Sequence, residues 1–190
     1  MNEELLLPTA YLAPVAYYAA LYRAGEGCIE VCEHYVKQTL RNRCMIAGPD
    51  GAFPLSIPVV KPDTPDMPIR QVRISDHGNW RHLHWRALQS AYGRTPFFEF
   101  YEDDFRPFFQ PDWEYLTDFN RQLLQTVCGL IGFQPRIADT TTFRRVPGCP
   151  LPLRPQRPYY QVFAQRHGFL PGLSIVDLLF NMGPESILFL

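Results

Sequence analysis

The sequence predicts an α/β fold: a single domain with a mixed sheet that starts with a βαβ-like unit, a β-hairpin and a cluster of helices. Three observations support this prediction. The chain opens with an apolar run, a helical pattern and a second apolar run, the order of a parallel βαβ unit. Two apolar arms then flank the turn at residues 48–51, and several amphipathic stretches follow. The length of 190 residues suits one domain with a substantial core.

The opening unit consists of a strand over Leu5–Leu7, a helix over about Val15–Arg23 and a second strand from Cys28 to about Glu33. Gly25 ends the helix, because glycine readily takes the left-handed conformation found just after many helices.

The hairpin is predicted over 41–47 and 52–60, with Gly-Pro-Asp-Gly between the two arms. Proline presets φ and glycine accepts a positive φ, so this turn has a physical basis. A loop then leads into a short strand around Gln71–Ile74, and residues 135–145 are a candidate for one more strand.

The helices are predicted from apolar residues at three- and four-residue spacing. Trp80, His84, Leu88 and Ala91 form one stripe of a helix that Gly93 ends. The other helical segments are 96–109, with a dense aromatic stripe, 111–133, the clearest helix, and 173–181, before a Gly-Pro break.

Charge and composition disfavour several classes of protein. The formal net charge of -1 gives no long-range attraction for nucleic acid, so an anion has to be bound by a local cluster. No apolar run is long enough for a membrane span, and the amino-terminal run lacks the basic region of a secretory signal; we therefore expect a cytoplasmic location. The five cysteines are scattered, which favours buried free thiols over a zinc site.

A proline-rich run covers about Val146–Tyr160 and cannot be a helix. Its extended bias predicts a surface-crossing connection within one domain spanning residues 1–190. The same run is the candidate segment for binding a protein partner.

A basic cluster is the strongest functional signal. Lys37, Arg41 and Arg43 lie within seven positions, and alternation along the predicted strand places both arginines on one side. Two guanidiniums can bracket a carboxylate or phosphate with bidentate charge-assisted hydrogen bonds, while Gln38 adds a neutral donor. The alternative is a solvated hairpin face, or a structural role in which the arginines pair with acids such as Glu30, Glu33 or those at 102–104.

Two further positions carry polar chemistry on apolar helix faces. His84 points inward and is either a general acid or base or a hydrogen-bonded core histidine. His82 and His84 are two residues apart and point in different directions, so no metal site is predicted. Asp177 and Asn181 share a helix face among apolar residues and bind either substrate or buried backbone.

No dinucleotide, kinase-type, serine-hydrolase or zinc-protease signature occurs, and no cofactor is predicted.

Four runs resemble the WbqC-like protein family: "PTAYLAPVAYYAAL", "YVKQTLRNRCMIAGPDGAFPLSIPV", "LHWRALQSAYGRTPFFEFYEDDFRPFF" and "LSIVDLLFNMGPES". The basic stretch matches at Lys37, Gln38, Arg41, Asn42 and Arg43. Members are often encoded with bacterial surface-polysaccharide genes, which implies a role in modifying an amino sugar or sugar nucleotide. The run at 7–18 lacks the glutamine, tryptophan and glycine of longer members, so the roles of those residues are not carried over to this chain. The short proline-rich run stands where longer members carry a Gly/Ser-rich segment, which implies a reduced or altered pocket.

Two hypotheses follow. The first is a transferase acting on a sugar nucleotide or amino sugar, with acyl or aminoacyl transfer as the reaction class and a small anionic or phosphorylated molecule as substrate. The second is a non-catalytic binding or scaffold protein of the same pathway. The residues assigned to catalysis are His84 and Asp177, and those assigned to substrate binding are Lys37, Gln38, Arg41, Asn42, Arg43, Tyr11, Trp80, Tyr92 and Asn181.

Overall fold

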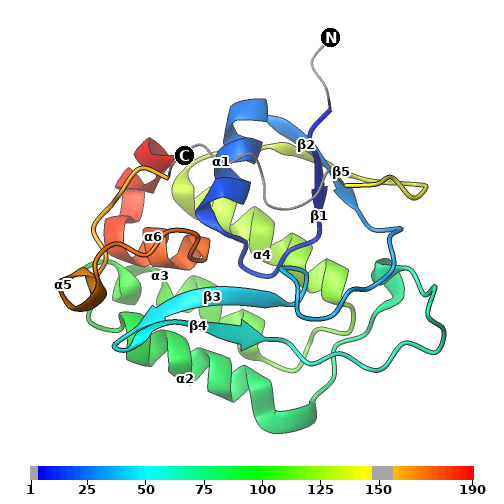
Figure 1. Ribbon diagram of the computed structural model, residues 1–190, viewed down its shortest axis with the longest axis horizontal. Helices are drawn as coiled ribbons and strands as arrows, with labels where there is room; N and C mark the ends of the chain where they lie inside the picture. The colour runs from blue at the N-terminus through cyan, green and yellow to red at the C-terminus, as the bar shows by residue number, and fades with distance from the viewer. Residues whose placement is uncertain (1–3, 147–155) are drawn as a thin grey trace.

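The structure is a computed structural model, which describes residues 4–146 and 156–190. The predicted βαβ unit forms, and a strand from later in the chain extends it to a three-stranded parallel sheet. Strand β1 (Leu6–Pro8) pairs with β2 (Glu26–Glu30), and β2 pairs with β5 (Arg136–Asp139). Helix α1 (Val15–Ala24) connects β1 to β2 and ends at Gly25, whose φ of 70° is left-handed as predicted. The sheet lies at one end of the molecule, near the amino terminus (Figure 1).

The hairpin forms a separate two-stranded sheet. Strand β3 (Arg43–Gly48) pairs antiparallel with β4 (Gly51–Ser56), and the predicted Gly-Pro-Asp-Gly sequence makes the turn. The hairpin packs between α6 (Ile175–Met182) and α2 (Trp80–Tyr92), as Figure 1 shows. The fold class predicted from the sequence, a single α/β domain with a hairpin and helices, is confirmed.

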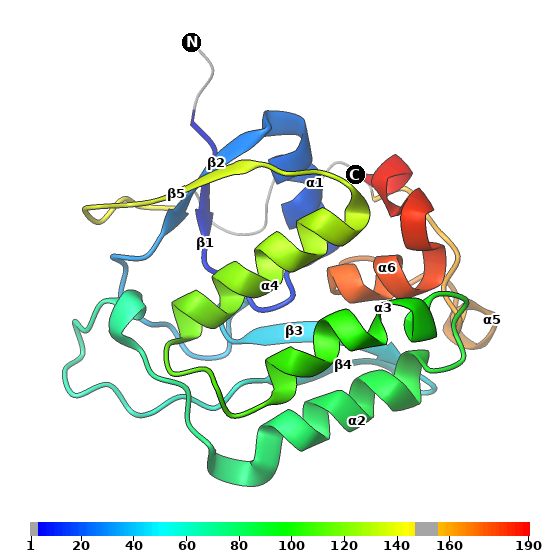
Figure 2. The same cartoon turned by 180° about the vertical axis from the view of Figure 1, so that it is seen from behind.

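The remaining helices cover the hairpin and the sheet. They are α3 (Phe98–Phe105), α4 (Leu116–Ile131) and α5 (Ala164–His167), with short 3-10 helices at Ile69–Gln71, His77–Asn79, Arg106–Phe109 and Gly183–Phe189. Helix α4 runs diagonally below the sheet and leads into β5 (Figure 2). The predicted inward stripe of α2 is confirmed, since Trp80, His84, Leu88 and Ala91 are all buried.

The strand predicted around Gln71–Ile74 is wrong. A 3-10 helix ends at Gln71, and only isolated bridges follow, from Arg73 to Tyr115 and from Ile74 to Val59. The segment forms one isolated bridge with each of two neighbours, residues 58–60 and 114–116, with two backbone hydrogen bonds to each, so no regular ladder develops.

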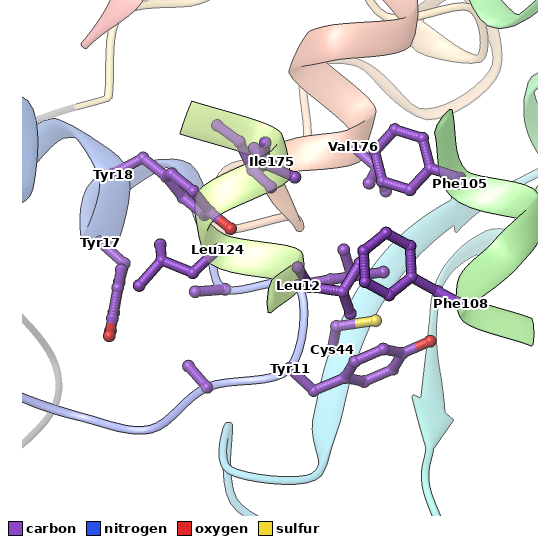
Figure 3. Packing of buried hydrophobic residues seen from close by; sticks show 14 of the residues in the cluster. Tyr11, Leu12, Tyr17, Tyr18, Cys44, Phe105, Phe108, Leu124, Ile175 and Val176 are labelled. Carbon is purple, nitrogen blue, oxygen red and sulfur yellow. The ribbon is translucent and has the colours of Figure 1, made fainter. Parts of the chain in front are cut away.

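One apolar cluster joins the amino-terminal loop, the helices and the hairpin. Figure 3 shows Tyr11, Leu12, Cys44 and Phe108 close together in this cluster. The loop before α1 and the start of α6 are also joined by backbone bonds: Pro14 bridges Ser174, and the Ile175 amide donates to Ala13 O at 2.9 Å.

The proline-rich run falls largely outside the described residues, because 147–155 belong to the undescribed part. Of the remainder, Tyr159 is buried, so this end of the run packs against the domain. Among the described helices, none is both long and apolar enough to cross a membrane.

Candidate functional site

A cleft of about 480 Å3 lies between the turn before β3 and the segment after β4. We call it the cationic cleft. Four residues assigned to substrate binding from the sequence line it: Lys37, Gln38, Asn42 and Arg43. The other lining residues are Tyr35, Ser56, Ile57, Pro58, Val59, Lys61 and Pro62.

The lining of the cationic cleft carries three positive charges and no carboxylate. Lys37, Arg43 and Lys61 form no ion pair within the part of the chain that the structure describes. Uncompensated cations that share one cleft attract an anion, and the planar Arg43 guanidinium suits a carboxylate or phosphate.

The turn that carries Lys37 and Gln38 is held in place at several points. Gln38 has a φ of 58°, in the left-handed region that few residues other than glycine adopt. Hydrogen bonds to backbone carbonyls fix the following residues, since the Tyr11 amide donates to Leu40 O at 2.9 Å and the side-chain Nδ2 of Asn120 donates to Arg41 O at 2.8 Å. The cations are therefore presented from a constrained backbone.

The floor of the cleft is made where β3 begins and β4 ends. Arg43 Nε donates to Ser56 Oγ at 2.8 Å, across the register pair of the two strands. Asn42 Nδ2 donates to Ile57 O at 2.8 Å, and its buried Oδ1 has no hydrogen-bond partner among the described residues. Burial raises the pKa of Tyr35, and the Asn42 side chain with the nearby guanidiniums opposes that rise.

Arg41 turns away from this arrangement toward Glu33. Its Nε donates to Glu33 Oε1 at 2.7 Å and its second terminal nitrogen to Oε2 at 2.5 Å. Strand β3 begins only at Arg43, so alternation along the strand does not place Arg41 beside Arg43. The contact is one of the structural pairings that the sequence left open.

His84 lies in the core behind the cleft. Its Nδ1 is 2.9 Å from the phenolic oxygen Oη of Tyr11, and its ring stacks on that of Tyr11 and meets Trp80 edge-on. Burial lowers the pKa of His84 to about 4, against a smaller opposing effect of a hydrogen bond to the Ser56 backbone. The imidazole is therefore neutral at pH 7.

Asp177 is the centre of a buried polar cluster. Its Oδ1 accepts from the Tyr92 hydroxyl at 3.0 Å, and its Oδ2 accepts from the Tyr159 hydroxyl at 2.7 Å and from Gln161 Nε2 at 2.9 Å. Burial raises the pKa of Asp177, while these three donors oppose the rise. Asn181 Nδ2 donates to Asp177 O at 2.7 Å.

The structure thus separates the predicted site residues into groups. Tyr11, Tyr92, His84, Asp177 and Asn181 have buried protein partners. Trp80 lines a different cavity, of about 620 Å3, together with Trp85, Arg81 and Arg106. The described residues contain no cluster of His, Cys, Asp and Glu that is suited to a metal ion.

Lys61 and Tyr35 complete the cationic cleft and were not identified from the sequence. A signal for Lys61 exists in the hairpin register: Arg43 faces Ser56, so the chain that leaves β4 passes the basic turn. Applying this register beyond the end of the hairpin would have placed residues 57–62 beside the turn.

Comparison with known proteins adds a family but no activity. The chain is 25% identical to the uncharacterized protein Rv1507c of Mycobacterium tuberculosis (strain ATCC 25618 / H37Rv) over 226 aligned residues, covering 98% of this chain and 96% of that protein. No solved structure matches the chain. The model of the WbqC-like protein family matches residues 9–157, a span that contains every residue of the cationic cleft. The resemblance noted in the sequence is confirmed, and the chain belongs to the WbqC-like protein family.

Proposed function

We propose that this protein binds a small phosphorylated or carboxylated sugar derivative in the cationic cleft. The observation that carries the proposal is the group of Lys37, Arg43 and Lys61, which lines one cleft with no acidic residue in its wall. Because the net charge of the chain is only -1, this local group, rather than the overall field, would hold the anion.

The proposed role is that of a cytoplasmic enzyme of bacterial surface-polysaccharide biosynthesis that modifies an amino sugar or a sugar nucleotide. The family resemblance implies this pathway, and acyl or aminoacyl transfer is the proposed reaction class. Arg43 would contact a phosphate or carboxylate through its fork, and the two lysines would add point charges. The catalytic roles of His84 and Asp177 stay predictions.

One observation favours the second hypothesis, a non-catalytic binding or scaffold protein of the same pathway. His84 and Asp177 both use their polar atoms on buried protein partners, and neither lines the cationic cleft. Under this hypothesis the cleft still binds its anion, but the bound molecule leaves unchanged.

The proposal is tested by equilibrium titration calorimetry with UDP-N-acetylglucosamine, UMP, inorganic phosphate and uncharged N-acetylglucosamine. We expect phosphorylated compounds to bind, and we expect Arg43→Gln and Lys61→Gln each to raise Kd by about tenfold, the loss that corresponds to one charge-assisted hydrogen bond. Arg86→Gln is the matched control, since Arg86 is exposed on α2 and lies outside the cleft. Unchanged affinity in both cleft variants would overturn the proposal.

Mass spectrometry of the bound compounds separates the two hypotheses. Incubation of the protein with a bound sugar nucleotide and acyl or aminoacyl donors should give a product of altered mass if the protein is a transferase. Tight binding, with the ligand recovered unchanged under every donor, would select the scaffold.

A further inference from the structure

A second pocket, of about 270 Å3, lies at the carboxyl ends of all three parallel strands. We call it the sheet-edge pocket. Thr9 follows β1, Val31 follows β2 and Thr140 follows β5, and all three line it. The opposite wall is formed by the first turns of α4, whose amino end lies on the same side as the ends of β2 and β5 (Figure 2). In open α/β sheets, ligands bind outside the carboxyl ends of the strands.

The charged groups of the sheet-edge pocket balance to zero and include both signs. Arg121 forms an ion pair with Asp139 and also lies in the electrostatic field of Asp118. Asp118 and Arg70 have no ion-pair partner among the residues that the structure describes. Among the hydrogen bonds of the described residues, the Arg70 guanidinium donates only to Cys32 Sγ, at 3.7 Å. A carboxylate and a guanidinium that form no ion pair in one small pocket suit a ligand that carries an ammonium and a carboxylate.

Asn120 supplies a hydrogen-bond acceptor that lacks a partner in the described part of the chain. Its Nδ2 donates to Thr9 Oγ1 at 3.1 Å and to Arg41 O at 2.8 Å. A backbone carbonyl can only accept, so the amide orientation is fixed by Arg41. Asn120 is 2% exposed, and its buried Oδ1 is left without a donor. A ligand N–H group would satisfy an atom that is costly to leave unpaired.

We propose that the sheet-edge pocket binds a small zwitterion of the α-amino acid class. Its ammonium group would lie between the Asp118 carboxylate and Asn120 Oδ1, and its carboxylate would accept from the Arg70 guanidinium. The hydroxyl groups of Thr9 and Thr117, which also line the pocket, supply further polar contacts for a short side chain.

The two pockets lie on either side of one backbone segment. Asn120, in the sheet-edge pocket, holds Arg41 O, and the next residue, Asn42, lines the cationic cleft. The zwitterion proposal does not rest on the proposed function, because its residues are distinct from those of the cleft.

The test is calorimetric titration of the whole protein with glycine, L-alanine and L-serine. Acetate, ethylamine and glucose serve as probes that lack the ammonium, the carboxylate or both charges. We expect at least one of the three amino acids to bind and each single-charge probe to bind about tenfold more weakly or worse, the effect of one lost charged contact. Binding of glucose in place of all three amino acids would overturn the proposal in favour of a neutral polyol site.

Single substitutions test whether an amino acid binds in the sheet-edge pocket. Asp118→Asn and Arg70→Gln should each weaken amino acid binding by about tenfold, whereas Asp112→Asn and Arg86→Gln, exposed residues outside the pocket, should leave it unchanged. Arg43→Gln should also leave it unchanged, so failure of this proposal is distinguishable from failure of the cationic cleft. Absence of amino acid binding, or an affinity equal to that of the parent in both pocket variants, would overturn the assignment.

Discussion

Arg41 and Glu33 form a two-point ion pair whose side chains are 14% and 10% exposed. Removing the arginine leaves a largely buried carboxylate without its partner, which is costly. We therefore expect Arg41→Ala to lower the free energy of unfolding by about 3 kcal/mol, as measured by urea denaturation. The double variant Arg41→Met with Glu33→Leu should recover most of that loss.

The Arg41→Ala variant also distinguishes a structural role of Arg41 from a role in binding the ligand. Phosphate-ester affinity of folded Arg41→Ala should stay within about threefold of the parent, because the guanidinium is engaged by Glu33. A variant that keeps its stability and loses the ligand would instead support the role assigned to Arg41 from the sequence.

His84 should make the protein less stable in acid. Its pKa falls from 6.5 to about 4 on folding, so the unfolded chain takes up a proton first as the pH drops. The stabilisation is complete above pH 6.5 and is lost between pH 6.5 and about pH 4. The free energy of unfolding falls by about 3 kcal/mol in total over this range. Urea denaturation of the parent and His84→Gln across this range measures the difference. An imidazole that titrates near 6.5 by NMR would contradict this and favour the proton-transfer role.

Asp177 should show the opposite dependence on pH. Its pKa is raised above 3.8 in the folded state. Its contribution to stability is therefore complete below pH 3.8 and declines as the pH rises through the folded pKa. Asp177→Asn also replaces one carboxylate oxygen with an amide N–H, which faces either the Tyr92 hydroxyl or the Tyr159 and Gln161 donors, and we expect the free energy of unfolding to fall by about 1–3 kcal/mol. The difference between parent and variant should be largest at the acid end of a denaturation series; a difference that grows toward neutral pH would refute this.

The described cysteines should differ in reactivity. Burial raises the pKa of Cys128 to about 12 and also raises those of Cys28 and Cys44, whereas Cys32 is only partly buried. Iodoacetamide labelling of the folded protein at pH 8, followed by peptide mapping, should modify Cys32 first. Labelling of Cys44 at the same rate as Cys32 would indicate that the core opens.

Local patterns predicted the elements well and their assembly only in part. The apolar stripe of α2, the stop at Gly25 and the Gly-Pro-Asp-Gly turn depend on residues close in sequence, so each was identifiable. The segment at 71–74 depends on two partners far along the chain, and its failure to form a strand had no local signal.

In the candidate site, too, residues close together in the sequence were predictable and residues brought in from distant segments were not. Four cleft residues come from one short run, and the sequence identified them together. Lys61 reaches the cleft through the hairpin register, and Asn120 reaches the sheet-edge pocket through the packing of α4 against the sheet. The partner of Arg41 was named only as one of several acids, because charge alone does not select among them.

The bonds between the amino-terminal loop and α6 affect the order in which the chain can fold during synthesis. Ser174 Oγ donates to Leu12 O at 2.7 Å, and the Ser174 amide donates to Met45 O at 2.8 Å, so both early segments lack these partners until the ribosome has released residue 174. Contacts of such long sequence separation close late and slow folding. The side of the loop and hairpin that α6 contacts thus lacks its partner until late in synthesis, and chaperones that hold nascent chains would have their longest opportunity to bind there.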